Sequence, residues 1–208
     1  YGDKIVWAEY RNGNMDIYMY DISTGQEIRI TTHPSFQVSP DIYGDKIAYA
    51  DYRNGNWDIY IYDMSTSTEK QITYSFLGYG SPKPDIYEDR IVWTSYNDKG
   101  ETTGIFMYDL STSLTKQITN SPRAQHSSIY GDKIVLSDYR YGNYDIYMYG
   151  LITDKETRIT ADPSNQYSPA IYGNKIIYED NRNGNVDIYV YDLITDKETR
   201  ITADPSNQ

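Results

Sequence analysis

The sequence predicts an all-β fold, specifically a β-propeller of four-stranded antiparallel blades, with five blades as the simplest count. Three observations predict it: an internal repeat, several β-rich runs within each repeat, and tight-turn residues between the runs. Aligned segments begin at residues 1, 43, 87, 130 and 172. This period of about 42 residues is typical of propeller blades and of some helical repeats. No segment shows helical periodicity, so the strand content favours the propeller.

Four kinds of β-rich run recur, and each is rich in Ile, Val and Tyr and bounded by turn-forming residues. The first kind spans residues 4–10, 46–52, 90–96, 133–139 and 175–181, and the second spans 16–21, 58–63, 105–109, 145–150 and 187–192. The third, ending in Ile-Thr, spans 29–31, 71–73, 117–119, 158–160 and 200–202. The fourth precedes each later repeat, at 39–43, 83–87, 127–130 and 168–172.

Short turns connect these runs into a meander. The first and second runs are joined by RNGN at 11–14, 53–56 and 182–185 and by RYGN at 140–143. Glycine at such positions supplies the positive φ that tight hairpins need. In the second run, DIYMYD at 16–21, both alternating sets of side chains are bulky. Both faces of the sheet therefore need cover, which stacked propeller blades provide.

The chain of 208 residues is expected to form one propeller domain over residues 1–208. The first repeat lacks the fourth kind of run, and the sequence ends just before the next such run would begin. Because repeat arrays need capped ends, we expect this chain to be a piece of a longer protein.

Composition excludes several classes of function. Cysteine is absent, which excludes disulfides, thiol catalysis and cysteine-held metal sites. The formal net charge of -11 argues against nucleic acid as a partner, because nucleic-acid binders must neutralise phosphates. No apolar run approaches the roughly 20 residues of a spanning helix, so no transmembrane segment is expected. Phosphate-loop, dinucleotide and zinc-protease motifs are also missing, and no cofactor is expected.

The assembled repeat reads S-P-x-I-Y-G-D-K-I, then D-x-R-N-G-N-x-D-I-Y-x-Y-D, then a turn and x-I-T. It resembles the TolB-type, WD-like β-propeller repeat along essentially the whole chain. The Tyr-rich form with YGDKI is similar to repeats in large cell-surface and surface-layer proteins of archaea and some bacteria. The resemblance implies a role as a protein-binding platform, as a lid over a peptidase domain, or as an extracellular module. We therefore expect a non-catalytic module at the cell surface that serves adhesion, envelope structure or the binding of a protein or glycan.

The charged residues of the hairpins allow two interpretations. The segment 51–58, DYRNGNWD, concentrates oxygen ligands and could suggest calcium, but an arginine interrupts it and the spacing does not fit an EF-hand. The preferred interpretation is structural, with no metal: an ion pair across each hairpin. The expected pairs are Arg11–Asp16, Arg53–Asp58, Arg140–Asp145 and Arg182–Asp187. In the third repeat both partners are replaced, by Asn97 and Gly104, as a true pair would require.

Catalysis was weighed against binding. Asp41 and Asp85 lie on presumed inner strands, so a five-bladed glycosidase-like enzyme is the alternative function. The other repeats have Ser128 and Ala170 at that position, which does not look like a converging catalytic set, so no catalytic residue is assigned. Binding would use aromatic and polar residues of the face that carries the links and hairpins. That face is expected to include Phe36, Tyr74, Phe76, Tyr79, Arg123, His126 and Tyr167. Five of these are the expected ligand-binding residues: Phe76, Tyr79, Arg123, His126 and Tyr167. Irregular loops at 75–83 and 97–104 direct the expected ligand toward the second and third repeats.

Overall fold

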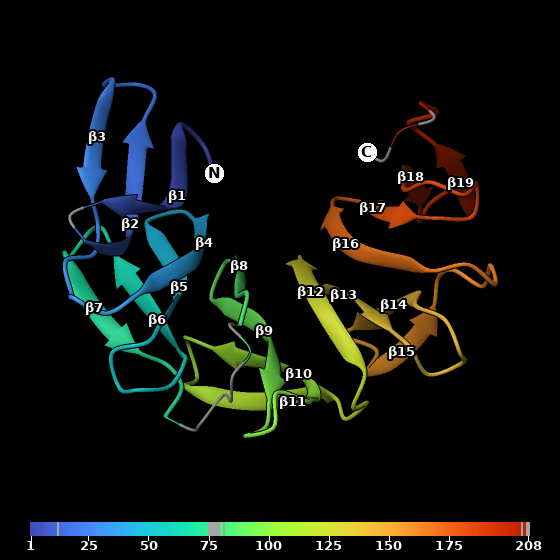
Figure 1. The fold of residues 1–208 in the computed structure, drawn as a ribbon, viewed down its shortest axis with the longest axis horizontal. Helices are drawn as coiled ribbons and strands as arrows, with labels where there is room; N and C mark the ends of the chain where they lie inside the picture. The colour runs from blue at the N-terminus through green and yellow to red at the C-terminus, as the bar shows by residue number, and fades with distance from the viewer. Residues whose placement is uncertain (12, 75–79, 81, 205, 207–208) are drawn as a thin grey trace. The chain divides into compact units, whose positions relative to one another are not determined.

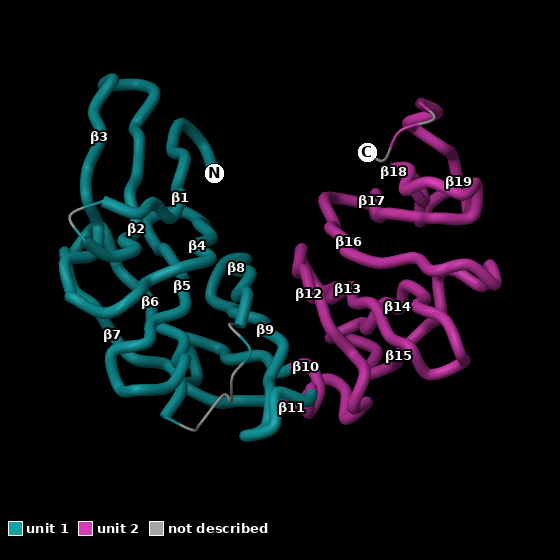
Figure 2. Tube along the Cα trace, viewed as in Figure 1, with its two compact units in different colours: residues 1–101, 106–116 teal, residues 102–105, 117–208 magenta. Residues whose placement is uncertain are grey.

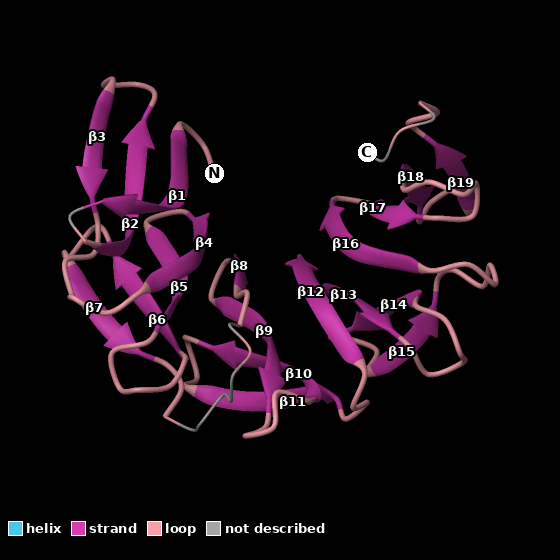
Figure 3. Cartoon of the chain, viewed as in Figure 1, coloured by secondary structure: helices cyan, strands magenta, loops and turns pink. Residues whose placement is uncertain are grey.

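The computed structural model describes residues 1–11, 13–74, 80, 82–204 and 206, and within these ranges it consists of strands, turns and loops without a helix (Figures 1 and 3). Five sheets follow one another along the chain, and we number them as blades 1 to 5. In each sheet the strands neighbour one another in chain order, as in a meander. The all-β fold and the strand order predicted from the repeats are therefore confirmed.

Blade 1 has three strands and the other blades have four, as the missing run in the first repeat predicts. Blade 1 contains β1 (Lys4–Arg11), β2 (Asn14–Asp21) and β3 (Gln26–Arg29). Blade 2 contains β4 (Gln37–Tyr43), β5 (Lys46–Asp51), β6 (Asp58–Asp63) and β7 (Thr68–Gln71). Blade 3 contains β8 (Asp85–Tyr87), β9 (Arg90–Tyr96), β10 (Thr102–Asp109) and β11 (Leu114–Thr119).

Blades 4 and 5 repeat the same pattern. Blade 4 contains β12 (Ala124–Tyr130), β13 (Lys133–Asp138), β14 (Asp145–Gly150) and β15 (Lys155–Arg158). Blade 5 contains β16 (Gln166–Tyr172), β17 (Lys175–Asp180), β18 (Asp187–Asp192) and β19 (Lys197–Arg200). The chain divides into two compact units, residues 1–101 with 106–116, and residues 102–105 with 117–208 (Figure 2).

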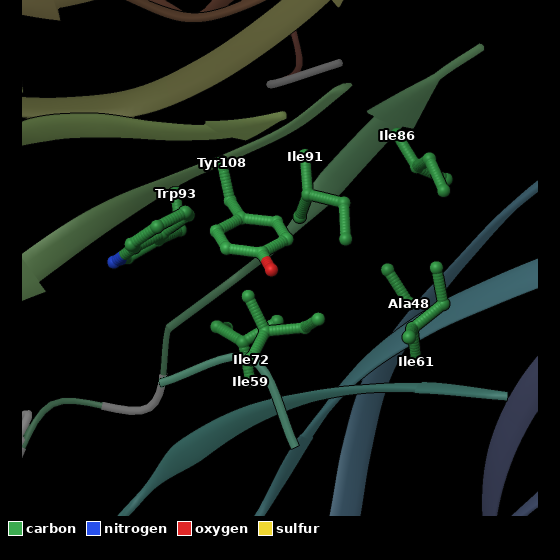
Figure 4. Packing of buried hydrophobic residues seen from close by; sticks show 8 residues of the cluster. All are labelled: Ala48, Ile59, Ile61, Ile72, Ile86, Ile91, Trp93 and Tyr108. Carbon is green, nitrogen blue, oxygen red and sulfur yellow. The ribbon is translucent and has the colours of Figure 1, made fainter. Parts of the chain in front are cut away.

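Within each unit the apolar core lies between neighbouring blades. In unit 1, Ile59 and Ile72 of blade 2 pack with Ile91 and Trp93 of blade 3 (Figure 4). In unit 2, Val135 of blade 4 belongs to the same buried cluster as Ile176 of blade 5. Both faces of a strand such as β6 are thus covered, which explains why its two alternating sets of side chains are bulky.

Side-chain hydrogen bonds tie the link between two blades, which is the segment from the last strand of one blade to the first strand of the next, to the preceding hairpin. The last asparagine of the hairpin holds the following link: Asn143 Nδ2 donates to the carbonyls of Asp162 and Ser164, each at 2.9 Å. Asn14 holds His33 and Ser35 in the same way, at 2.9 and 3.0 Å. The second asparagine of RNGN therefore fixes a loop, in addition to its place in the turn.

Candidate functional site

The predicted hairpin ion pairs are wrong, because each arginine binds other carboxylates. In blade 2 the Arg53 guanidinium bonds Asp51 at 2.6 Å and also Glu69 of β7, and it lies 4.2 Å from the ring centre of Tyr60. Asp58 instead accepts hydrogen bonds from Asn56 and Gln71, both at 3.0 Å. The same correction holds for the predicted pairs Arg11–Asp16, Arg140–Asp145 and Arg182–Asp187. Arg11 binds Glu9 and Glu27. Arg140 binds Asp138 and Glu156, and Arg182 binds Asp180 and Glu198.

Strand register explains the correction. Asp51 and Asp58 are direct cross-strand partners, so two buried carboxylates lie side by side in the blade. One arginine of the hairpin satisfies the first carboxylate, and the second carboxylate needs its own partner from the third strand. That partner is an arginine in three blades, in the pairs Arg29–Asp16 at 2.7 Å, Arg158–Asp145 at 2.6 Å and Arg200–Asp187 at 2.7 Å. The RIT motif, which becomes QIT at Gln71, was the sequence signal for this pairing.

These charged residues form a structural network within the blades. Among the described residues there is no group of three or more His, Asp or Glu side chains that could hold a metal ion. Asp41, one of the two aspartates of the glycosidase-like alternative, has a structural bond: its Oδ2 accepts from the backbone N of Ile86 in blade 3 at 2.8 Å. Ser128 makes the matching bond to Ile171 N at 3.4 Å between blades 4 and 5.

Two of the five predicted binding residues come together. His126 and Tyr167 line one hollow of about 320 Å³ in unit 2, together with Gln125, Tyr144, Asn165 and Asn181. We call it the Tyr167 hollow. Arg123 lies apart from its lining, with its guanidinium 5.1 Å from the ring centre of Tyr139. Phe76 and Tyr79 lie outside the described residues.

The backbone of two strands and two loops positions this lining. Gln125 and His126 lie on β12 and Tyr167 lies on β16. The register shifts between Gln125 and Ser128 in β12, and between Tyr167 and Ala170 in β16. At the shift His126 has a positive φ of 54°, a value that only a locally irregular strand allows. His126 Nδ1 lies 3.4 Å from Ser137 Oγ. Tyr144 precedes β14, and Asn181 follows β17.

Two asparagines present amide donors at the Tyr167 hollow. Asn165 Oδ1 accepts from Tyr144 N at 3.0 Å, and Asn181 Oδ1 accepts from Asn165 N at 2.9 Å. With both oxygens bound to backbone, the side-chain NH₂ groups have no acceptor among the described residues. Burial, with Glu179 and Asp180 nearby, raises the pKa of Tyr167, so its hydroxyl is neutral at pH 7.

The fifth repeat departs from the others at residues that line the Tyr167 hollow. Counted from the repeat start, Asn181 takes the position of a tyrosine in every other repeat, namely Tyr10, Tyr52, Tyr96 and Tyr139. Asn165 takes the position of Phe36 in blade 2 and Arg123 in blade 4. The backbone bond between these two positions is kept, as Tyr52 N to Phe36 O at 3.0 Å and Asn181 N to Asn165 O at 3.3 Å. The position of Asn165 varies, with Gly80 in blade 3, whereas at the position of Asn181 an amide replaces a tyrosine ring, which is the sequence signal for this departure.

Comparison with known proteins supports the fold. No protein-family model matches the sequence, and no curated protein matches it. Among solved structures, TolB from Acinetobacter baumannii is similar with a TM-score of 0.78 and 22% identity over 97% of this chain and 54% of that one. An oligogalacturonate lyase in complex with manganese has a TM-score of 0.74 and 14% identity over 99% of this chain and 63% of that one.

The β-propeller domain of the Trilobed protease from Pyrococcus furiosus is also similar, with a TM-score of 0.72 and 14% identity over 98% of this chain and 67% of that one. The chain thus spans about half to two thirds of the length of these structures. The fold is a five-bladed, TolB-type β-propeller. Identities this low show the fold alone. The described residues include no helix, and therefore no helix long and apolar enough to cross a membrane.

Proposed function

We propose that this chain is a non-catalytic module of an extracellular or cell-surface protein and that it binds a glycan in the Tyr167 hollow. One observation carries the proposal: the lining combines two tyrosine rings with histidine and amide side chains and contains no Asp, Glu, Lys or Arg among the described residues. Sugars are recognised by rings that stack on their apolar faces and by planar polar groups that bond their hydroxyls. The proposal thus selects the glycan from the two partner classes, protein and glycan, that the sequence suggests.

The same lining argues for binding without catalysis. Glycoside hydrolysis uses two carboxyl groups that flank the scissile bond. The described lining of the Tyr167 hollow offers none, and the nearby Asp180 is committed to Arg182 at 2.5 Å. Pre-formed hollows of a few hundred Å³ with a few fixed polar groups are typical of ligand sites.

A glycan array with the intact chain, followed by titration of the best-bound glycan, tests this proposal. Asn181→Tyr restores the residue of the other four repeats and should fill the Tyr167 hollow, so we expect at least a tenfold loss of affinity with an unchanged melting temperature. Tyr141→Ala is the matched control, since Tyr141 is exposed on the same hairpin as Tyr144 but does not line the hollow. Unchanged binding by Asn181→Tyr, or cleavage of the bound glycan, would contradict the proposal.

Localisation rests on the resemblance to surface-layer repeats. Labelling of intact source cells with a membrane-impermeant amine reagent should modify the exposed lysines of this chain. Protection of these lysines until the cells are lysed would contradict a surface location.

A further inference from the structure

Blade 3 lacks a charged network that the other four blades share. In those blades an arginine guanidinium lies over a tyrosine ring, at 4.6 Å for Arg11–Tyr18, 4.2 Å for Arg53–Tyr60, 4.1 Å for Arg140–Tyr147 and 4.5 Å for Arg182–Tyr189. Each guanidinium also binds one carboxylate before the hairpin and one on the third strand. The third repeat replaces this whole set with uncharged residues: Ser95, Asn97, Phe106 and Thr115.

Where this network is lost, the described residues leave a space open. A hollow of about 420 Å³ in unit 1, which we call the blade-3 hollow, is lined by Ile72, Thr73, Tyr74, Trp93, Ser95, Phe106 and Thr115. Asn97, which replaces the arginine, turns into its own loop. Its Oδ1 accepts from the backbone N of Lys99 at 2.9 Å and of Glu101 at 3.0 Å, and its Nδ2 donates to Glu101 Oε2 at 2.8 Å.

The blade-3 hollow contains a buried donor without an acceptor. Trp93 is 3% exposed, and its indole N–H has no hydrogen-bond partner in the part of the chain that the structure describes. In blade 1 the equivalent Trp7 donates to Glu9 Oε2 at 2.9 Å, and Ser95 stands at the position of Glu9. A buried donor of this kind destabilises the folded state when it is left unsatisfied. Its retention beside a hollow points to an acceptor that a ligand brings.

We propose that the blade-3 hollow binds an uncharged aromatic molecule that carries a hydrogen-bond acceptor. The Trp93 and Phe106 rings, 6.1 Å apart and inclined by 21°, form an aromatic wall. In the other blades the space beside the equivalent ring holds a flat guanidinium, so the shape suits a flat group. No carboxylate or cation occurs among the described lining residues, so a charged ligand would lose its hydration without compensation. This site is independent of the Tyr167 hollow.

The test uses benzamide as the probe and the tryptophan indole N–H signals in a nitrogen-15 correlation spectrum. Three tryptophans give three signals, which single Trp→Phe variants assign. We expect a saturable downfield shift of the Trp93 signal as its N–H finds the benzamide oxygen, while the Trp7 signal stays in place because Glu9 holds that N–H. Benzamidine has the same ring with a cation in place of the acceptor and should bind at least tenfold more weakly. Equal shifts with both compounds, or none with benzamide, would overturn the proposal.

Two variants make the test specific to this hollow. Ser95→Glu restores the acceptor that Trp7 has in blade 1, so the Trp93 signal should already lie downfield and benzamide affinity should fall at least tenfold. The combined variant Ser95→Asp, Asn97→Arg, Thr115→Glu rebuilds the network of blade 2 and should abolish the shift. If Ser95→Glu binds benzamide as tightly as the parent, Trp93 is not the donor and the proposal fails, whether or not the combined variant folds.

Discussion

Gln71→Arg should stabilise the protein, because Asp58, unlike Asp16, Asp145 and Asp187, has no cationic partner among the described residues. Asp16, Asp145 and Asp187 each bind an arginine of the third strand, whereas Asp58 has only uncharged donors, including Gln71 Nε2 at 3.0 Å and Thr73 Oγ1 at 3.1 Å. Burial raises the pKa of Asp58, which means that the folded state disfavours its ionised form. An arginine at position 71 would offset this effect.

The expected gain is modest. A charge-assisted bond is about twice as strong as a neutral one, but Gln71 already donates to Asp58, and its bond to Thr73 O at 2.8 Å would be lost. The equivalent arginines are about one third exposed, with 31%, 35% and 34% for Arg29, Arg158 and Arg200, so solvent screens part of the attraction. Burial also raises the pKa of Asp145, despite Arg158. We expect Gln71→Arg to raise the free energy of unfolding by about 1 kcal/mol, which corresponds to a rise in melting temperature of roughly 2–4 °C for a chain of this size.

Scanning calorimetry and urea unfolding at several pH values measure this gain. The stabilisation requires ionised Asp58, so it should be full at pH 7 and should disappear as the pH falls through the pKa of Asp58 in the variant. The reciprocal change, Arg158→Gln in blade 4, should destabilise the protein at pH 7 by a similar or larger amount. Gln71→Met controls for the loss of the amide without adding charge.

One result would refute this reasoning. If Gln71→Arg stabilises equally in an Asp58→Asn background, the gain does not come from the ion pair. A neutral effect at pH 7, together with a clear loss in Arg158→Gln, would show that the hydrogen bonds around Asp58 already compensate its charge.

Three further predictions concern hydrogen bonds. Tyr189→Phe should lower the free energy of unfolding by about 1 kcal/mol, because Asn183 Nδ2 donates to the Tyr189 hydroxyl at 2.8 Å. Tyr147→Phe should leave the free energy of unfolding unchanged, because no described residue bonds the buried Tyr147 hydroxyl. Equal urea midpoints for the two variants would contradict this. Thr160→Val should lower the free energy of unfolding by about 1–3 kcal/mol, because Ile146 N loses the acceptor that lies at 2.8 Å. Thr160→Ser keeps the hydroxyl and should retain most of that stability in the same urea assay. Burial raises the pKa of Asp41, so Asp41→Asn should stabilise at pH 7 and lose this advantage as the pH falls through that pKa; an advantage that persists at pH 3 would contradict the assignment.

The repeat predicted the fold well because its signals are local. Glycine turns such as that of residues 53–56 and strands such as DIYIYD at 58–63 depend on neighbours in sequence, and five copies average out the irregularities. Ion-pair partners are not local. Arg53 reaches Glu69 on the third strand, and Asp58 faces Asp51 across the hairpin, so only the strand register identifies which charges meet. Proximity in sequence therefore suggested Arg53–Asp58, and packing selected other partners.

In a repeat protein, coordinated departures from the repeat carry more information about function than the repeated residues do. The repeated arginines and aspartates appeared to be the chemically rich positions, yet they build the blades. Asn181 stands where the other four repeats have tyrosine, and it lines the Tyr167 hollow. The third repeat replaces a complete charged set at once, and a stepwise loss would have left a buried charge unpaired at a cost of several kcal/mol. Joint replacement by Ser95, Asn97 and Thr115 avoids that cost and opens the blade-3 hollow beside an indole N–H that no described residue satisfies. Drift would be expected to repack such a space, so the open hollow favours a bound ligand as the reason for its retention.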